Sequence, residues 1–457
     1  MKTKITLLIL LFLGINFGFT QQDEECMTKL SIFHEYVKAK NYDAAYEPWM
    51  AVRNKCPKFN NAIYVDGEKI LEDKIKKSTG ADKVAYVNDL LKLWEQRAEH
   101  FASKTPKGEY AAQACQLMYD NKEALGKTKE ELYECFDVAY KLDKATFTNP
   151  KSLYTYFSLM VDLYDTGKKP AKDLFNKYDD VVEKVEEEVK NYSEKLNELI
   201  EKDSTGATYT KKETQYKRFY ESYLKAYDQI SGSIDSKLGE RANCENLIPL
   251  YQKDFEDNKH DAVWLKRAVS RMFNKECTDD PLYIKLVKAY DEEAPSADTK
   301  YFVAGLLLKN NKETEAISYF NQSFDLETDA FKKSKLAYRI GLILKNKGRY
   351  GQARGYFRKA LKLNPSNGRP HMAIASMYAA SANSCGDTTF NKRAVYWLAA
   401  DEARRAAHVD PTLRSASSKS VANYMAKAPQ KSDIFKEANS GKTIKIGCWI
   451  GSSVTVP

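Results

Sequence analysis

The chain has 457 residues, with 72 Lys and Arg against 63 Asp and Glu, which gives a formal net charge of +9. Basic and acidic residues are mixed along the sequence, so the charge favours solubility and acidic partners, and we exclude nucleic acid as a partner. After the N-terminus, no stretch reaches the ~18 apolar residues of a membrane-spanning helix, so the mature chain is predicted to have no transmembrane segment.

Residues 1–20 have the composition of a secretory signal peptide. Lys2 and Lys4 supply the positive start, and the apolar run from Ile5 to Ile15 is too short to span a bilayer. A single membrane anchor is the alternative interpretation. We therefore expect an exported protein in the periplasm, with the cell surface and the extracellular space as alternative locations.

Residues 21–168 are predicted to form an N-terminal domain of paired helices, because apolar residues recur at helical spacing between turns. The first pair covers residues 26–60, and its pattern contains Phe33, Tyr36, Tyr42, Ala45, Trp49, Val52 and Pro57. Roughly five further helices are expected over residues 60–167.

In residues 169–233 the spacing of the apolar residues is different. Apolar residues recur at steps of three and four, close to a heptad pattern, at Leu174, Tyr178, Val181, Val185, Val189, Tyr192, Leu196 and Leu199. The spacing returns at Tyr216, Tyr220, Tyr223, Tyr227 and Ile230. We predict a long antiparallel helical hairpin, with two ordinary long helices lying flat against their neighbours as the alternative. The tyrosines are interpreted as packing residues, and a ligand platform is the other possibility.

Residues 234–428 return to paired helices and end in a capping helix. The most regular pair covers residues 334–367, with the sequence SKLAYRIGLILKNKGRYGQARGYFRKALKLNPSN. Its marked positions are Gly341, Leu344, Gly348, Tyr350, Ala353, Phe357, Ala360 and Pro365. Small residues let two helices approach closely, aromatic residues fill the space between them, and the proline ends the second helix. This stretch resembles a tetratricopeptide repeat (TPR), a helical hairpin that buries its apolar face by stacking on neighbours.

The predicted fold class is therefore all-α. We expect a solenoid of TPR and TPR-like helical hairpins, with the long antiparallel hairpin inserted and a short β-like tail at residues 429–457. In the tail, Ile444, Ile446, Ile450 and Val454 alternate with polar or small residues, which indicates strands. A disordered tail is the alternative.

Eight cysteines in an exported chain favour disulfides. They are Cys26, Cys56, Cys115, Cys135, Cys244, Cys277, Cys385 and Cys448. The first two pairs lie on consecutive antiparallel helices, the third pair brackets a helical unit, and Cys385 is left to hold Cys448. We therefore predict sequential pairing. A zinc site is the rival interpretation, but no CxxC occurs and the five histidines are scattered.

No catalytic pattern is found. The sequence contains no HExxH, GxSxG or GxGxxG motif, and the SGKT at residues 440–443 lacks the first glycine of a phosphate-binding loop. We predict a protein that is not an enzyme and has no cofactor, no metal and no catalytic residue.

The resemblance to TPR proteins implies a concave groove lined by the first helix of each repeat. Projected onto this chain, its candidate partner-binding residues are Phe302, Lys309, Asn310, Tyr338, Lys345, Asn346 and Arg369. The repeated Lys-Asn pair implies a groove that holds the acidic end of a peptide. The alternative is that Lys and Asn simply end an exposed helix.

The chain resembles exported TPR proteins of the Bacteroidota, on its opening KNYDAAYEPWMAVRNKCP and its ending IGCWIGSSVTV. That resemblance implies a non-enzymatic interaction scaffold in the cell envelope, which binds another envelope protein or a peptide segment in assembly or secretion at the outer membrane. Alternatives are a periplasmic sensor for a peptide or glycan fragment and a structural homo-oligomer.

Overall fold

The computed structural model describes residues 24–457, so the predicted signal peptide at residues 1–20 lies outside the described residues. The chain divides into two compact units, the first ending at Val181 and the second running from Val182 to Pro457. The boundary falls inside the first arm of the predicted hairpin, so residues 169–233 do not form a unit of their own.

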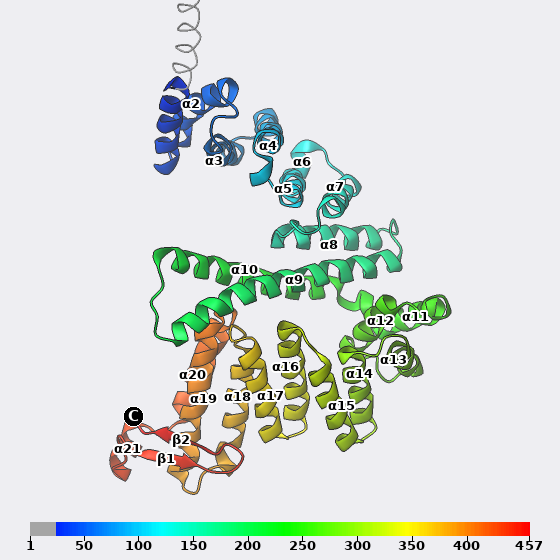
Figure 1. Ribbon diagram of the computed structural model, residues 1–457, viewed down its shortest axis with the longest axis vertical. Coiled ribbons are helices and arrows are strands. Elements are labelled where there is room, and N and C mark those ends of the chain that lie inside the picture. The colour runs from blue at the N-terminus through cyan, green and yellow to red at the C-terminus, as the bar shows by residue number, and fades with distance from the viewer. Residues whose placement is uncertain (1–23) are drawn as a thin grey trace, which may run out of the picture. The chain divides into compact units, whose positions relative to one another are not determined.

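The first unit consists of helices joined by short turns (Figure 1). Residues 24–38 are helical, and they are followed by α2 (Tyr42–Lys55), α3 (Ala62–Lys77), α4 (Gly80–His100), α5 (Lys107–Asp120), α6 (Lys122–Leu125), α7 (Lys129–Leu142), α8 (Pro150–Asp165) and the start of α9 (Ala171–Ser204). Trp49 is fully buried in the core of the first helices, and its indole Nε1 donates to the Ile63 carbonyl at 2.7 Å. A Cβ at Gly67 would lie 2.5 Å from the Trp49 ring, so glycine is what lets α3 pack this closely on α2.

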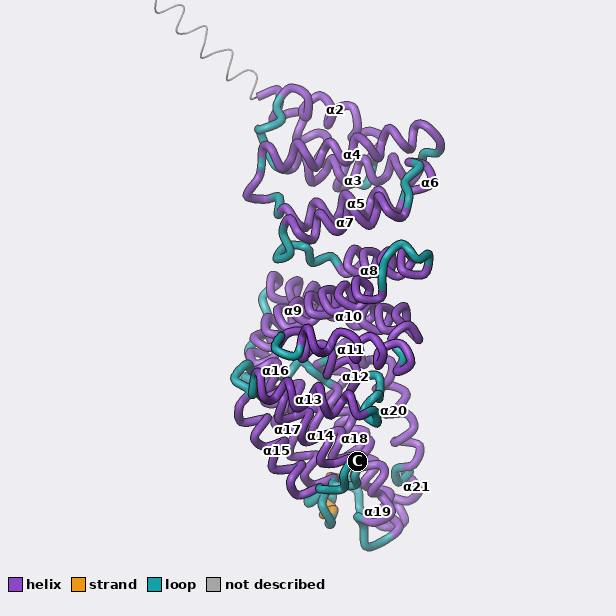
Figure 2. Tube along the Cα trace, turned by 90° about the vertical axis from the view of Figure 1, so that its right-hand side faces the viewer, coloured by secondary structure: helices purple, strands orange, loops and turns teal. Residues whose placement is uncertain are grey.

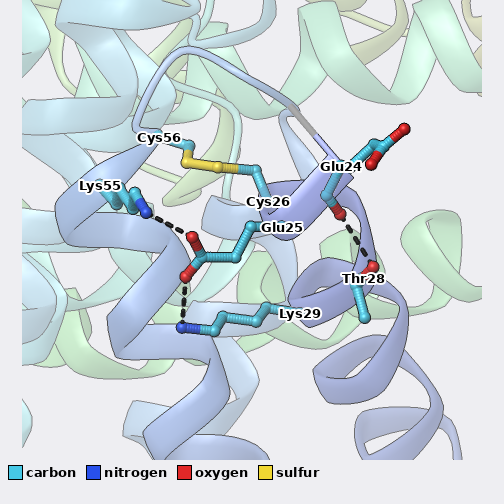
Figure 3. The surroundings of a disulfide bond; sticks show 7 residues. All are labelled: Glu24, Glu25, Cys26, Thr28, Lys29, Lys55 and Cys56. Carbon is cyan, nitrogen blue, oxygen red and sulfur yellow. Dashed lines mark hydrogen bonds and ion pairs between the residues drawn. A yellow bond between two sulfur atoms is a disulfide. The ribbon is translucent and has the colours of Figure 1, made fainter. Parts of the chain in front are cut away.

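The disulfides join the eight cysteines in the order that the sequence predicts: Cys26–Cys56, Cys115–Cys135, Cys244–Cys277 and Cys385–Cys448. Figure 3 shows the first of them, where the Glu25 carboxylate lies between the ammonium groups of Lys29 and Lys55. Each bridge connects two elements of the same compact unit.

The second unit is also helical, apart from a two-stranded sheet near its end (Figure 2). After the rest of α9, its elements are α10 (Lys211–Leu238), α11 (Cys244–Asn258), α12 (Ala262–Asn274), α13 (Pro281–Glu293), α14 (Ala297–Lys309), α15 (Glu313–Leu326), α16 (Ala330–Asn346), α17 (Tyr350–Leu363), α18 (Arg369–Ser381), α19 (Thr389–Val409), α20 (Arg414–Lys427), α21 (Lys431–Glu437), β1 (Thr443–Ile446) and β2 (Ser452–Thr455). The expected all-α class with its solenoid of helical hairpins is confirmed. No helix among residues 24–457 has the length and the apolar content needed to cross a membrane.

The pair α16 and α17 shows how the repeat packs. A Cβ at Gly341 would lie 2.6 Å from the Phe357 ring, so the glycine on α16 makes room for the aromatic side chain on α17. The buried Ser334 hydroxyl donates to the Ala360 carbonyl at 2.8 Å. In the preceding pair the direction is reversed, because the Ser323 hydroxyl on the second helix, α15, donates to the Ala297 carbonyl on the first helix, α14, at 2.6 Å.

The hairpin of α9 and α10 lies across one end of the later helices of the second unit (Figure 1). Asn197 on α9 donates to the Asn364 side chain at 3.0 Å, just after α17. Arg414, at the start of α20, pairs with Glu221 on α10 at 3.1 Å. The two alternatives from the sequence are therefore combined, because the helices form a hairpin and this hairpin lies flat against its neighbours.

The C-terminal tail folds back on the last helices. Strands β1 and β2 pair antiparallel, with Ile444 opposite Val454, as the alternating pattern predicts. The helix α21 is a correction to the predicted extended tail. Its first turn is fixed by reciprocal hydrogen bonds between Gln430 and Asp433, a local capping arrangement that outweighs the extended tendency of the rest of the tail.

Candidate functional site

The first helices of the last three repeats, α14, α16 and α18, carry the candidate partner-binding residues. Phe302 on α14 is only 4% exposed, and its ring lies 5.6 Å from that of Phe273 and 5.5 Å from that of Tyr301. Aromatic packing with the preceding repeat therefore occupies this side chain. Phe302 is a packing residue and presents little surface to a partner.

The first Lys-Asn pair ends α14. The Lys309 ammonium donates to the Thr278 carbonyl at 2.6 Å and forms an ion pair with Asp279, in the turn before α13. Asn310 is exposed at the helix end. Because Lys309 already has two oxygen partners, a ligand carboxylate would have to compete with Asp279 for it.

The second Lys-Asn pair ends α16 and is more open. Lys345 is half-buried and forms no ion pair with any residue from 24 to 457, while Asn346 is exposed. Tyr338 lies two turns earlier on the same helix, partly exposed, with its ring 5.8 Å from that of Phe357. Burial raises the pKa of the Tyr338 hydroxyl above its ordinary value, so this group stays a neutral hydrogen-bond donor. A positive charge, an amide and a hydroxyl thus share one helix.

The beginnings of the first helices are held by the α9–α10 hairpin. Arg369, the first residue of α18, is exposed and forms an ion pair with Asp228 on α10. Lys335 on α16 pairs with Glu186 on α9 at 2.6 Å. Carboxylates of the hairpin therefore engage the candidate residue Arg369 and a second cation, Lys335, on the helix that carries Tyr338 and Lys345. These partners are more than 100 positions apart in the chain, so no local pattern in the sequence could indicate them.

The hairpin also carries a cluster of aromatic rings. The Tyr192 ring on α9 lies 5.1 Å from that of Tyr223 and 6.0 Å from that of Tyr227 on α10. Tyr227 is fully buried, whereas Phe219 is 45% exposed. The interpretation of these tyrosines as packing residues fits their contacts between the two arms.

The tail lies against the ends of the repeat helices. Trp449 donates from Nε1 to the Ser381 hydroxyl at 2.9 Å, and its ring lies 5.5 Å from those of Tyr350 and Tyr378. These residues are at the start of α17 and in the last turn of α18. The tail therefore packs at the turn end of the repeats, where its tryptophan contacts Tyr350, Tyr378 and Ser381.

Groups with the composition of a catalytic or metal site are few among the described residues. No cluster of three or more His, Cys, Asp or Glu side chains within residues 24–457 could hold a metal ion. Asp137, Tyr156 and Lys177 form a buried polar group in the first unit, where the Lys177 ammonium lies 3.0 Å from the Asp137 carboxylate. Tyr156 and Lys177 are 19 and 40 positions from Asp137, too far apart for sequence spacing to reveal the group.

A family model for the tetratricopeptide repeat matches residues 334–367, so the chain contains a repeat of this type at α16 and α17. The photosystem I assembly protein Ycf3 of Acaryochloris marina is 30% identical over 83 residues, which cover 18% of this chain and 50% of that protein. The chain thus spans about half the length of this curated relative.

Two solved structures are also similar. A tetratricopeptide repeat protein from Parabacteroides merdae has 12% identity, a TM-score of 0.25, and coverage of 69% of this chain and 97% of its own. Yeast Tom70 has 13% identity, a TM-score of 0.25, and coverage of 92% and 84%. A TM-score of 0.25 is too low for either superposition to support the assignment of the fold.

Proposed function

We propose that the protein is a non-enzymatic interaction scaffold of the cell envelope that binds a partner protein or peptide segment through the first helices of its C-terminal repeats. The observation that carries this proposal is the tetratricopeptide repeat at residues 334–367, with Lys345 and Asn346 left open on α16. Helical repeats of this kind present stacked surfaces for protein partners and supply no chemistry of their own.

The location in the envelope is part of the same proposal. It is supported by the composition of residues 1–20 and by the use of all eight cysteines in disulfides, which persist in oxidising compartments. In that setting the scaffold serves assembly or secretion at the outer membrane. The partner is recognised by an acidic group that reaches Lys345, with Asn346 donating a hydrogen bond beside it.

The test is photo-crosslinking in the native cells from a reactive residue at position 346. We expect one envelope protein to be captured, and capture to fall at least tenfold in Lys345→Glu. The matched control is Lys419→Glu, which makes the same charge change at an exposed residue of α20 and should leave capture intact. Equal loss in both variants, or no captured protein, would refute binding at this surface.

A further inference from the structure

The charge around the clear repeat is strongly one-sided, contrary to the mixing expected for the whole chain. Residues 330–386 contain 12 Lys and Arg and no Asp or Glu. Three of these cations pair with carboxylates from other parts of the second unit: Lys335 with Glu186, Arg369 with Asp228, and Arg349 with Glu313. A surface with many cations and no acid of its own favours negatively charged partners.

Helix α17 presents part of this charge on its outer face. Arg354, Arg358 and Lys362 follow one another at intervals of four residues and therefore lie on the same side of the helix. The opposite side is buried at Ala353, Phe357 and Ala360. Arg358 and Lys362 are exposed, and neither forms an ion pair with any residue in the described part of the chain.

Two glycines share this outer face. Gly351 and Gly355 are exposed within the helix, and a Cβ at Gly355 would meet no atom within 4 Å. Glycine inside a helix is destabilising relative to alanine, so internal packing gives no reason for it here, in contrast to Gly341, where Phe357 needs the space. What glycine provides at an exposed position is room for another backbone to approach α17.

An aromatic side chain borders the same face. The Arg354 guanidinium lies 5.2 Å from the Trp449 ring centre and donates to the Ile450 carbonyl at 2.5 Å. Trp449 is partly exposed and lies next to Gly351. The residue before it, Cys448, is fixed by the disulfide to Cys385. Tryptophan beside arginine is a combination typical of residues that dominate the energy of protein interfaces.

We propose that the outer face of α17 and Trp449 form a docking surface for an acidic α-helix of a partner protein. Carboxylates four residues apart on such a helix match the spacing of Arg354, Arg358 and Lys362, and the two glycines allow close helix contact. On α17 itself the face carries no large apolar side chain, and the Trp449 ring packs against Tyr350 and Tyr378, so a helix fits this surface better than a membrane does. This inference rests on the proposed scaffold function and adds a second surface to it. The second surface lies on α17, whereas Lys345 lies on α16.

The test uses the full-length mature protein and a fluorescein-labelled, alanine-based helical peptide with Glu at every fourth position. Fluorescence anisotropy should show it binding at least tenfold tighter than the same peptide with Gln, a difference of about 1.4 kcal/mol. Arg358→Glu with Lys362→Glu should weaken binding at least tenfold. Gly355→Leu should weaken it without any change of charge and without loss of stability. The matched control is Lys431→Glu with Lys436→Glu on α21, which makes the same charge change elsewhere and should bind as the wild type does.

Several outcomes would overturn the docking surface. They are equal binding of the Glu and Gln peptides, equal losses in the α17 and α21 variants, or face-dependent binding of phosphatidylglycerol vesicles without peptide binding. Lys345→Glu separates the two proposals. It should leave peptide binding unchanged, while it removes the crosslinked partner of α16.

Discussion

Asp137 joins three helices of the first unit through polar contacts in a buried position. The Tyr156 hydroxyl on α8 donates to its carboxylate, and the Lys177 ammonium on α9 lies 3.0 Å away. Burial alone would raise the pKa of Asp137, but hydrogen bonds from Lys141, Tyr156 and Lys177 outweigh this effect and hold the pKa below its ordinary value. The carboxylate is therefore charged in the folded state and stabilises it.

Asp137→Asn should lower the free energy of unfolding of the first unit by about 3 kcal/mol at pH 7, because it leaves the Lys177 charge buried without its partner. The pH dependence has a defined sign. Since folding lowers this pKa, the stabilisation is present above about pH 4 and is lost as the pH falls toward the folded-state pKa. Urea unfolding at pH 7 and pH 3 should show a larger loss in the wild type than in Asp137→Asn. The exposed control Asp82→Asn should keep the wild-type pH dependence, and equal losses in all three proteins would contradict this account.

Gly341 and Gly355 predict opposite responses to the same substitution. Gly341→Ala places a methyl group 2.6 Å from the Phe357 ring, so overpacking should destabilise the second unit by about 1–3 kcal/mol. Gly355→Ala meets open space and should stabilise α17 by about 0.5–1 kcal/mol. Denaturant unfolding of the two variants checks both signs. A destabilising Gly355→Ala would mean that α17 needs glycine for its own packing, which would also remove one support of the docking surface.

At the scale of elements, local periodicity predicted helices well and long-range packing poorly. The three-four spacing from Leu174 to Leu199 identified the first arm of the hairpin because it depends only on residues of one helix. Which helices the hairpin packs against depends on pairs such as Lys190 with Asp329, which are 139 positions apart in the chain. No short-range pattern can contain that information.

The candidate site, too, was predictable only in its local part. The repeat spacing identified α14, α16 and α18 as the helices that carry it, but it could not distinguish an open position from an occupied one. Phe302 is buried by Phe273 of the preceding repeat, and Lys309 is held by Asp279. The absence of acids between residues 330 and 386, in contrast, was readable from the sequence and required only a local count of charges.

The Cys385–Cys448 disulfide predicts how the tail is held to its repeat. Replacing both cysteines by serine opens a loop with a sequence separation of 63, which costs about 4 kcal/mol in the chain-entropy model. Apart from the backbone, this disulfide is the covalent link between the tail and the repeat helices. We therefore expect the sheet and Trp449 to detach before the helices unfold. Hydrogen exchange should increase at residues 443–455 and remain slow in α16. Unchanged protection of the tail would show that the Trp449 contacts hold it without the disulfide.

At the scale of the whole molecule, each disulfide lies within one compact unit, so only the backbone joins the two units covalently. The bridges of the first unit end at Cys135, and those of the second begin at Cys244. The exposed turn at residues 205–208, between α9 and α10, lies in the interval that no bridge crosses. One cut in this turn should therefore leave no covalent bond between the two parts of the chain.

A recognition site for a sequence-specific protease, inserted between Gly206 and Ala207, tests this pairing. After cleavage, a denaturing gel without reductant should show two separate fragments. Gel filtration under native conditions should still show one species, because Tyr192 on α9 contacts Tyr223 on α10 across the cut and Lys202 pairs with Glu213 at 2.6 Å. Fragments that stay joined until reductant is added would show a bridge between the units, such as Cys56 with Cys385, and would contradict sequential pairing. Fragments that separate in native buffer would show instead that the chain connection at the turn is needed to keep the hairpin together.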